Sequence, residues 1–346
     1  MKFSNIFSSK SNTDDKQLLR DLLSDLQTPN FPNGITGQLS IEQSSNSFHV
    51  KVPFNPEFVE DEIKAALATR AFDQPVTLSH QPPQKHKQAI ANIKLVVAIA
   101  SGKGGVGKST VTANLAAALA KTGHKVGVLD ADIYGPSVPL MFGLQGQQVE
   151  SKDGKRMEPF NQHGVFLNSI GFLVPDEQAV VWRGPMASKA LMQVINETNW
   201  PELDVLLVDM PPGTGDIQLT MSDTVKCDGA LIVTTPQTVA LADADKGINM
   251  FNKVATPIVG LVENMSLFVC ESCGTSHALF GDSGGVECAK RHNVPLLAQL
   301  PLKQTIREAG DSGQLYGLTE NNEYQPLAFS LMMQLSKQTE NIIALG

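Results

Sequence analysis

Short apolar runs alternate with amphipathic segments along the chain from residue 93 onward. The apolar runs have the length of strands and lie at 95–100, 125–132, 164–171, 204–210, 229–235, 257–264 and 295–301. Hydrophobic positions at helical spacing lie at 111–123, 185–198, 215–226, 238–253, 284–293, 303–310 and 325–343. Continuous apolar strands that alternate with helices are typical of a mostly parallel sheet covered by helices on both faces. The pattern therefore predicts an α/β domain over residues 93–346.

The residues before this domain show a different pattern, in which leucines at helical spacing precede segments of apolar–polar alternation. The predicted elements are a helix at 14–26, strands at 35–43 and 47–54, a helix at 56–72 and a strand at 74–79. This order predicts a small α+β domain over residues 14–79. The polar residues 1–13 are expected to form a flexible N-terminus, and the proline-containing residues 80–92 to form a linker.

Composition excludes several classes of protein. The chain has 346 residues, of which 42% are hydrophobic and 18% charged, as in an ordinary globular protein. A net charge of −8 argues against a general nucleic-acid-binding surface, and no apolar window approaches the length of a membrane span. The N-terminus lacks the apolar core of a signal peptide, and four cysteines do not form a disulfide framework. We therefore expect a cytoplasmic protein without nucleic-acid or membrane partners.

The segment 99–110, IASGKGGVGKST, matches the phosphate-binding pattern G-x-x-x-x-G-K-[ST] and lies between a predicted strand and a predicted helix. Glycines allow the backbone to turn its N–H groups toward an anion, and the helix that follows adds the positive end of its dipole. In this pattern Lys108 reaches the β- and γ-phosphates and the Ser109 hydroxyl binds Mg²⁺. The predicted ATP-binding residues of the loop are Gly102, Lys103, Gly104, Gly105, Val106, Gly107, Lys108, Ser109 and Thr110.

Lys103 is a second lysine within this loop. The sequence KGGVGKS resembles the deviant Walker A loop of the nitrogenase iron protein, MinD and ParA group. The resemblance implies a nucleotide-sandwich dimer in which Lys103 reaches the phosphates that the partner binds. Such a lysine would supply in trans the charge that an arginine finger supplies elsewhere. The alternative is a solvated lysine on a mobile loop.

Carboxylates follow two of the predicted strands. Asp209 ends the run 204–210, where an aspartate can hold Mg²⁺ opposite Ser109, and the turn PPGTGD after it has the glycines of a switch loop. Asp130 and Asp132 end the run 125–132, and residues 130–139 and 210–216 are the predicted switch segments that respond to the γ-phosphate. By resemblance to the deviant Walker A group, Asp132 orients the attacking water and Asp130 supports the Mg²⁺ hydration shell. The alternative is that these two carboxylates only cap the following turn.

Asn264 ends another predicted strand, in the sequence VGLVENM. It resembles the asparagine that binds the adenine edge in the same group. An asparagine at the end of a strand is also a common turn residue, so the two interpretations both stand at this stage.

Cys270 and Cys273 form a C-x-x-C pair that is open to three interpretations. A redox pair would require a thioredoxin-like strand-to-helix corner, whereas Gly274 and polar residues follow here. A zinc site requires about four ligands, and His277 is the nearest further candidate. An iron–sulfur cluster also requires about four thiolates, which a two-fold dimer would supply as two from each chain. Spacing alone does not distinguish zinc from iron–sulfur.

Several motifs together resemble the Mrp/ApbC family of iron–sulfur carrier ATPases. They are KGGVGKST, DADIYGPSVP, DMPPGTGD, VENMS with its C-x-x-C pair, and IREAGDSG, in the order of that family. The resemblance implies a slow ATPase that forms a homodimer, bridges a [4Fe–4S] cluster with Cys270 and Cys273 of both subunits, and receives the cluster from scaffold proteins for transfer to apo-proteins. It also implies that residues 14–79 are a MIP18-like domain. Cys227 and Cys288 are expected to be buried small hydrophobes.

Two other functions remain as alternatives. A ParA- or MinD-like positioning ATPase would require a basic surface or a basic amphipathic tail, and the last predicted helix carries only Lys337 as a cation. A zinc-stapled NTPase would use the cysteines structurally. Metal analysis of the anaerobically purified protein distinguishes the two: a cluster carrier contains iron with sulfide, and a zinc-stapled NTPase contains zinc alone.

Overall fold

The computed structural model describes residues 12–44, 47–83, 90, 92–173, 184–270 and 272–343. The predictions for residues 1–11, for the turn at 45–46 and for linker residues 84–89 and 91 lie outside these ranges. Within the described residues, no helix combines the length and the hydropathy needed to cross a membrane.

The chain divides into two compact units, which are Gln84–Leu331 and the combination of Met1–Pro83 with Met332–Gly346. The last helix therefore belongs partly to each unit. Within the smaller unit, its Ser336 hydroxyl accepts a hydrogen bond of 2.8 Å from the backbone N–H of Gln38. The predicted extent of the larger domain, residues 93–346, did not anticipate this division, because it depends on a contact between residues far apart in the sequence.

The smaller unit has the predicted element order α-β-β-α-β. Its elements are α1 Asn12–Ser24, β1 Ser40–Ser44, β2 Ser47–Val52, the 3₁₀ turn η1 Pro56–Phe58, α2 Glu60–Thr69 and β3 Val76–His80. Strand β1 pairs antiparallel with β2, and β2 pairs parallel with β3. The side chains of Leu19, Phe48 and Ile63 are fully buried in this unit. The single predicted helix at 56–72 is divided into η1 and α2.

The described residues of the larger unit form a nine-stranded sheet in the order β11-β10-β9-β4-β8-β5-β7-β6, with β12 also paired to β10. Its pairings are parallel except those of β6 and β11. The strands are β4 Ile93–Ala100, β5 Val126–Asp130, β6 Phe160–Gln162, β7 Val165–Ser169, β8 Leu203–Asp209, β9 Gly229–Thr234, β10 Ile258–Val269, β11 Ser276–His277 and β12 Leu296–Leu302.

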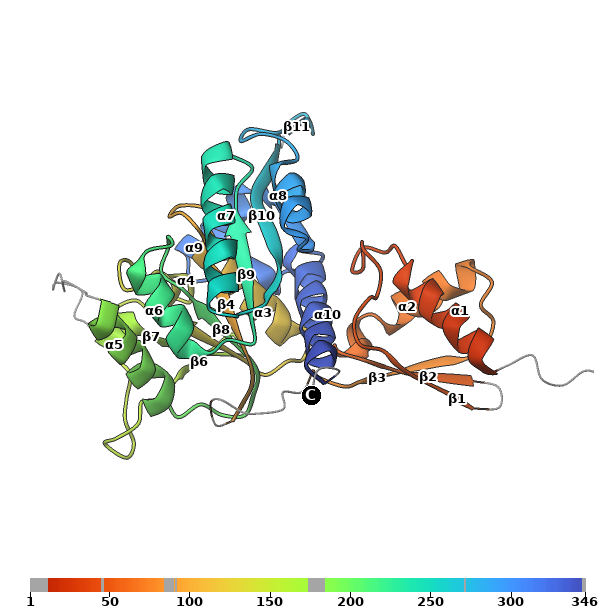
Figure 1. Cartoon of the computed structure of the whole chain (residues 1–346), viewed down its shortest axis with the longest axis horizontal. Coiled ribbons are helices and arrows are strands. Elements are labelled where there is room, and N and C mark those ends of the chain that lie inside the picture. The colour runs from red at the N-terminus through yellow and green to blue at the C-terminus, as the bar shows by residue number, and fades with distance from the viewer. Residues whose placement is uncertain are drawn as a thin grey trace, which may run out of the picture. The chain divides into compact units, whose positions relative to one another are not determined.

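Helices cover both faces of this sheet (Figure 1). They are α3 Lys108–Lys121, α4 Val138–Met141, η2 Ile170–Leu173, α5 Gly184–Glu197, α6 Asp216–Val225, α7 Thr238–Lys253, α8 Gly284–His292, α9 Gln304–Asp311, η3 Tyr316–Leu318 and α10 Tyr324–Ile343. Alternate residues of a strand point to opposite faces. Val96, Ala98 and Ala100 of β4 join one core with α5 to α8, while α3 packs on the other face. The predicted α/β class is confirmed.

Strand β10 extends further than the sequence indicated. The predicted strand ends at Asn264, whereas β10 continues to Val269 and pairs there with β11. The two strands protrude together at the top edge of the sheet in Figure 1. Met265 has a positive φ of 55°, and the pairing with β12 shifts register between Asn264 and Phe268. An irregularity of this kind interrupts the alternation of apolar and polar residues, which is why the pattern alone ended the strand too early.

Candidate functional site

The glycine loop between β4 and α3 has a conformation that requires its glycines. Gly105 and Gly107 have positive φ values of 82° and 83°. A Cβ on Gly102 would lie 2.0 Å from the backbone carbonyl oxygen of Asp243, and a Cβ on Gly107 would lie 2.2 Å from Asn264 Nδ2. The loop leads directly into α3, whose N-terminus can bind a phosphate.

Lys108 and Asp209 form a buried ion pair beneath the loop. Strands β4 and β8 are neighbours, so the end of β8 lies beside the start of α3. Lys108 Nζ lies 2.7 Å from Asp209 Oδ2, and Ser109 Oγ donates to the same oxygen at 2.6 Å. Thr112 Oγ1 donates to Asp209 Oδ1 at 2.6 Å. The predicted Ser109–Asp209 pair is thus brought together. Thr112 was not predicted, although its position four residues after Lys108 places both on one helix face.

Asp130 organises the segment that follows β5. Its carboxylate accepts hydrogen bonds from the backbone N–H groups of Asp132 at 3.1 Å and Val138 at 3.2 Å, and from the Ser169 hydroxyl at 3.3 Å. Burial, followed by the negative charge of Asp209, raises the pKa of Asp130 from 3.8 to about 8. The contacts with Val138 and Ser169 come from other elements and could not be inferred from the motif.

Asp132 lies beside Lys108. Its Oδ2 atom is 3.8 Å from Lys108 Nζ, and its Oδ1 atom accepts a hydrogen bond from the N–H of Tyr134 at 3.1 Å. The side chain is buried, and this burial raises the pKa of Asp132. A carboxylate beside this lysine is suitably placed to orient a water molecule.

The donor set of this site suits a hard divalent cation. The Ser109 hydroxyl and the Asp209 carboxylate converge within 2.6 Å of each other, and oxygen ligands of this kind are those that Mg²⁺ prefers. Asp130 belongs to the same sheet edge, because it lies opposite Asp209 in the β5–β8 register. Its oxygens accept hydrogen bonds from Asp132, Val138 and Ser169, and its predicted part in the Mg²⁺ shell stays a prediction.

Asn264 is tied to the glycine loop. Its Nδ2 atom donates to the carbonyl oxygen of Val106 at 2.9 Å, and the side chain is buried. The structure therefore assigns Asn264 a contact with the phosphate loop, which the sequence did not predict. The predicted contact with adenine stays a prediction.

The C-x-x-C pair lies in a tight turn between β10 and β11. The N–H of Cys270 donates to the carbonyl of Thr275 at 3.0 Å, and the N–H of Gly274 donates to the carbonyl of Cys270 at 2.8 Å. Cys270 is half-buried and Cys273 is exposed. Cys273 Sγ is 3.2 Å from Thr275 Oγ1, and hydrogen bonding with that hydroxyl lowers the pKa of Cys273. The turn thus presents two thiols at the surface.

The nearest predicted third ligand does not join this pair. The ring of His277 lies 6.4 Å from the ring of Phe268, centroid to centroid. Among the described residues, the set of potential ligands that converge within 4.8 Å consists of Asp245, Cys288 and His292, on α7 and α8. The cysteine turn by itself therefore offers two ligands, fewer than a zinc or cluster site requires.

The carboxylate of Asp245 is the centre of that other set. It accepts hydrogen bonds from Arg291 at 2.8 and 2.9 Å and lies 2.7 Å from His292 Nε2. Cys288 is buried, as predicted, and its Sγ atom lies 3.4 Å from the same carboxylate. Burial, together with Asp245, raises the pKa of Cys288 to about 11. The guanidinium of Arg291 already neutralises Asp245, so this set is a hydrogen-bonded link between two helices. Cys227 is half-buried.

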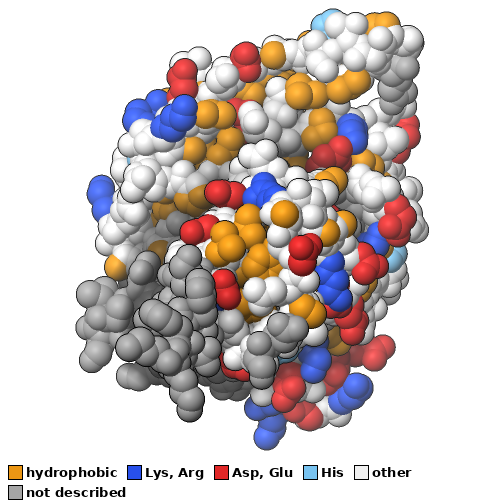
Figure 2. All heavy atoms as spheres, turned by 90° about the vertical axis from the view of Figure 1, so that its right-hand side faces the viewer, with side chains coloured by type: hydrophobic (Ala, Val, Ile, Leu, Met, Phe, Trp, Pro, Cys, Tyr) orange, Lys and Arg blue, Asp and Glu red, His pale blue; other side chains and the backbone are white. Residues whose placement is uncertain are grey.

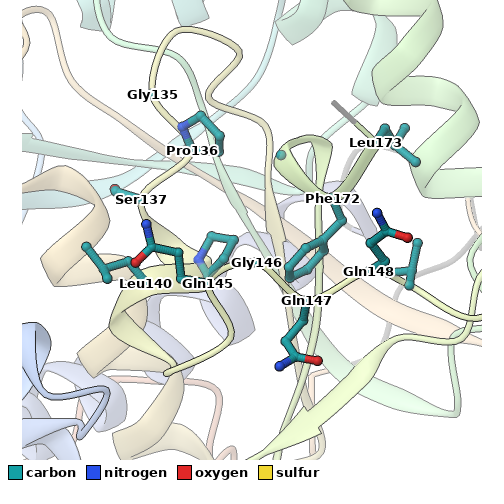
Figure 3. A pocket seen from close by; sticks show the side chains of 13 residues that line it. Gly135, Pro136, Ser137, Leu140, Gln145, Gly146, Gln147, Gln148, Phe172 and Leu173 are labelled. Atoms are coloured by element: carbon teal, nitrogen blue, oxygen red, sulfur yellow. The ribbon is translucent and has the colours of Figure 1, made fainter. Parts of the chain in front are cut away.

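A cavity of about 880 Å³ lies beside the predicted switch segment 130–139. Figure 3 shows Ser137 and Leu140 on one side of it and Phe172 and Leu173 on the other. Its lining comes from these segments and from residues 145–149 rather than from the glycine loop. The switch segment therefore faces open space on one side, while Asp130 holds it on the other.

Comparisons with known proteins identify the family. The profile of the NUBPL iron-transfer P-loop NTPase family, within the ParA group, matches residues 92–336. The chain belongs to this family. The match includes the glycine loop, both carboxylate segments and the cysteine turn, so the NUBPL-type fold accounts for most of the larger unit.

Curated relatives carry related names. The iron-sulfur cluster carrier protein of Escherichia coli (strain K12) is 54% identical over 229 residues, which are 66% of this chain and 62% of that protein. The chain thus matches less than two thirds of the length of this relative. The iron-sulfur cluster transfer protein NUBPL of Dictyostelium discoideum is 40% identical over 302 residues, which are 85% of this chain and 94% of that protein.

Solved structures support the fold. A nucleotide-binding protein from Archaeoglobus fulgidus, in complex with ADP and with Co, superposes with a TM-score of 0.59 at 38% identity, over 67% of this chain and 91% of that one. The cell division ATPase MinD from Pyrococcus furiosus superposes with a TM-score of 0.50 at 25% identity, over 73% of this chain and 99% of that one.

Proposed function

We propose that this protein is an ATP-hydrolysing carrier that holds an iron–sulfur cluster as cargo and transfers it to apo-proteins. The observation that carries this proposal is the pair of thiols, half-buried Cys270 and exposed Cys273, in the turn after a strand that contacts the phosphate loop through Asn264. The family is described as iron-transferring, and relatives of this chain are named iron–sulfur cluster carriers.

The site at the sheet edge supplies the groups that ATP hydrolysis requires. Lys108 neutralises the β- and γ-phosphates, and Asp132, 3.8 Å from Lys108, orients the attacking water. Ser109 and Asp209 would hold Mg²⁺, which supplies charge neutralisation at the phosphates. Lys103 lies exposed on the loop, where a second copy of the chain can meet it. Removing any of these charges weakens stabilisation of the transition state.

The cysteine turn requires a second chain to complete a cluster site. A [4Fe–4S] cluster is held by about four thiolates, and the turn offers Cys270 and Cys273. A two-fold homodimer brings the same surface of each subunit together and so supplies four. Exposed ligands at such an interface leave the cargo accessible to a scaffold protein that delivers it and to an apo-protein that accepts it.

The two alternatives have less support. On the face shown in Figure 2, Lys and Arg side chains are interspersed with Asp and Glu rather than gathered into a basic area of the kind that a DNA- or membrane-positioning ATPase uses. A zinc-stapled NTPase would require further ligands close to the cysteine turn, and His277 packs on Phe268 instead. A cluster carrier of this kind is expected to act in the cytoplasm.

Anaerobic reconstitution tests the proposal directly. The full chain is incubated with iron and sulfide, desalted, and analysed for iron, acid-labile sulfide and molecular mass. The proposal expects a dimer that contains iron and sulfide in equal amounts, shows a cluster chromophore and hydrolyses ATP. Zinc without sulfide would contradict the cargo, and a monomer with a full complement of iron would contradict the shared site.

A further inference from the structure

The cysteine turn has little contact of its own with the body of the protein. Every described residue from Ser272 to Leu279 is exposed, and Phe280 is the first that is half-buried. On the other side of the turn, Val269 is exposed as well, and β10 is half-buried again at Phe268 and buried at Ser266, whose hydroxyl donates to the carbonyl of Leu300 at 3.0 Å. The position of the two thiols therefore depends on the base of the hairpin, which we define as residues 265–270 and 272–280.

Both legs of this hairpin face the phosphate loop across a cavity. A cavity of about 110 Å³ separates them from the loop and is lined by Met265 and Phe280 of the hairpin, by Thr235 and Gln237 after β9, and by four residues of the loop. The loop residues are Lys103, Gly104, Gly105 and Val106. A change in the position of this loop consequently reaches the hairpin at two points, one in each leg.

The hairpin is internally stiff. Phe268 and Val269 of β10 pair with His277 and Ser276 of β11, and the rings of Phe268 and His277 lie against each other. Hydrogen bonds between Cys270 and Thr275 and between Cys270 and Gly274 close the turn. A small unit held by this many internal bonds moves as one body, so a displacement at its base carries the thiols with it.

Met265 lies where such a displacement is easiest. Its φ of 55° is in the left-handed region, which a residue with a Cβ rarely adopts, and the β10–β12 register is irregular from Asn264 to Phe268. Backbone conformations of this kind are strained and are often found at switch regions. On the side of the loop, Asn264 is anchored by its bond to Val106. Met265 is thus the first residue of the strand beyond the anchor.

We propose that Met265 and Phe280 are positioning residues through which the nucleotide bound at the phosphate loop sets the placement of Cys270 and Cys273. This inference rests on the proposed function, because it supplies the physical link between ATP and the cargo. The link runs along β10 and back along the segment after β11, not through the switch segments at 130–139 and 210–216. Nucleotide binding moves residues 103–106, the two side chains follow, and the stiff hairpin transmits the movement.

The test measures the reactivity of the thiols in the full chain without any cluster. Alkylation of Cys270 and Cys273 by iodoacetamide is followed by peptide mass spectrometry with no nucleotide, with saturating Mg·ADP and with saturating Mg²⁺ and a non-hydrolysable ATP analogue. In the wild-type protein we expect the rates to differ about fivefold or more between nucleotide states, as for typical allosteric coupling. In Met265→Gly and Phe280→Ala we expect this difference to vanish while the nucleotide still binds.

Two neighbouring positions provide matched controls. Leu267→Gly removes a side chain from the same strand, and Leu279→Ala removes one beside Phe280, but neither residue lines the cavity and both are exposed. These variants are expected to keep the difference between nucleotide states. Asparagine tolerates a positive φ but lacks the long side chain of methionine. Met265→Asn is therefore expected to lose the difference between nucleotide states. If Met265 and Phe280 were only structural, the loss of nucleotide dependence would not be confined to variants of residues that line the cavity.

The outcomes separate this inference from the proposed function. Nucleotide-independent alkylation in a wild-type protein that binds nucleotide would overturn the link, and so would a full response in both Met265→Gly and Phe280→Ala. Neither result would affect reconstitution with iron and sulfide, which tests the carrier function by itself. Failure of reconstitution would remove the carrier function but leave the alkylation measurement readable, because that measurement uses cluster-free protein.

Discussion

The two regions that carry the chemistry of this protein are constructed in opposite ways. At the sheet edge, Lys108, Asp130 and Asp209 are buried, and each has hydrogen-bond or ion-pair partners within the chain. At the tip of β10, Cys270 and Cys273 lie half-buried and exposed, in a turn supported mainly by its own backbone. One region is organised before any ligand arrives, whereas the other is open to solvent.

The difference follows from what each region is proposed to do. Stabilising charge in a transition state is most effective where water is excluded and the charges are already in place. A cargo that must pass to another protein needs ligands that the acceptor can approach. Lys108 is therefore buried, as stabilisation of charge requires, and Cys273 is exposed, as transfer of a cargo requires. The comparison predicts that changes at the first region affect stability and turnover, while changes at the second affect cargo alone.

The largest effect is expected from Lys108→Ala. Removing this buried cation takes away the charge nearest the predicted phosphate position, so kcat/KM for ATP hydrolysis should fall by about 100-fold or more. Phosphate release measures the loss, and Lys125→Ala, which removes an exposed lysine outside the site, is the control. Unchanged hydrolysis in Lys108→Ala would place ATP turnover elsewhere.

The next largest effect concerns cargo rather than turnover. In the double variant Cys270→Ser, Cys273→Ser, iron and sulfide after reconstitution should fall to background. Because these side chains are not part of a core, the free energy of unfolding should change by no more than about 0.5 kcal/mol. Cys288→Ala is the contrasting variant, since its thiol is buried: it should keep the iron and lose stability. Iron retained in the double variant would mean that other residues bind the cluster.

A pH dependence distinguishes the two regions as well. The pKa of Asp130 is 3.8 in the unfolded chain and about 8 in the folded protein. Between these values the folded state holds a proton that the unfolded state has lost, so the free energy of unfolding falls as pH rises, by roughly 1 kcal/mol per pH unit. This contribution is complete below the unfolded pKa and is lost as pH passes the folded one.

Asp130→Asn should remove that slope in nucleotide-free protein. Urea unfolding at pH values between roughly 5 and 8, which lie between the unfolded and folded pKa values, measures this slope. Asp153→Asn, which changes an exposed carboxyl whose pKa is lowered by the N–H of Arg156, should leave the slope unchanged. An equal slope in wild type and Asp130→Asn would mean that another group carries the proton.

The smallest effect is expected from Thr112→Val. Its hydroxyl donates to Asp209 Oδ1 at 2.6 Å and lies 3.0 Å from the carbonyl oxygen of Lys108, a second acceptor for the same proton. Loss of this donor to a buried carboxylate should lower the free energy of unfolding by about 1–2 kcal/mol. Chemical denaturation measures the change, and Thr112→Ser, which keeps the hydroxyl, should recover most of it. No difference between the valine and serine variants would show that the hydrogen bond contributes nothing.

The sequence by itself determined the fold class and the position of the chemistry along the chain. Apolar runs predict strands locally, and parallel strands place their carboxyl ends at one edge, so the glycine loop, Asp209 and Asp130 were expected to meet there. The pair Cys270 and Cys273 was identified from its C-x-x-C spacing. These features depend on residues close together in the sequence, which is why a pattern can report them.

Only the tertiary structure decided which groups touch. Thr112 on Asp209, Ser169 on Asp130 and Asn264 on Val106 join residues 30 or more positions apart, and so depend on strand order and register. The same holds for the continuation of β10 past the irregular backbone at Met265 to Val269, where it pairs with β11. Such contacts form between segments that are distant in the sequence, so the pattern within either segment cannot predict them.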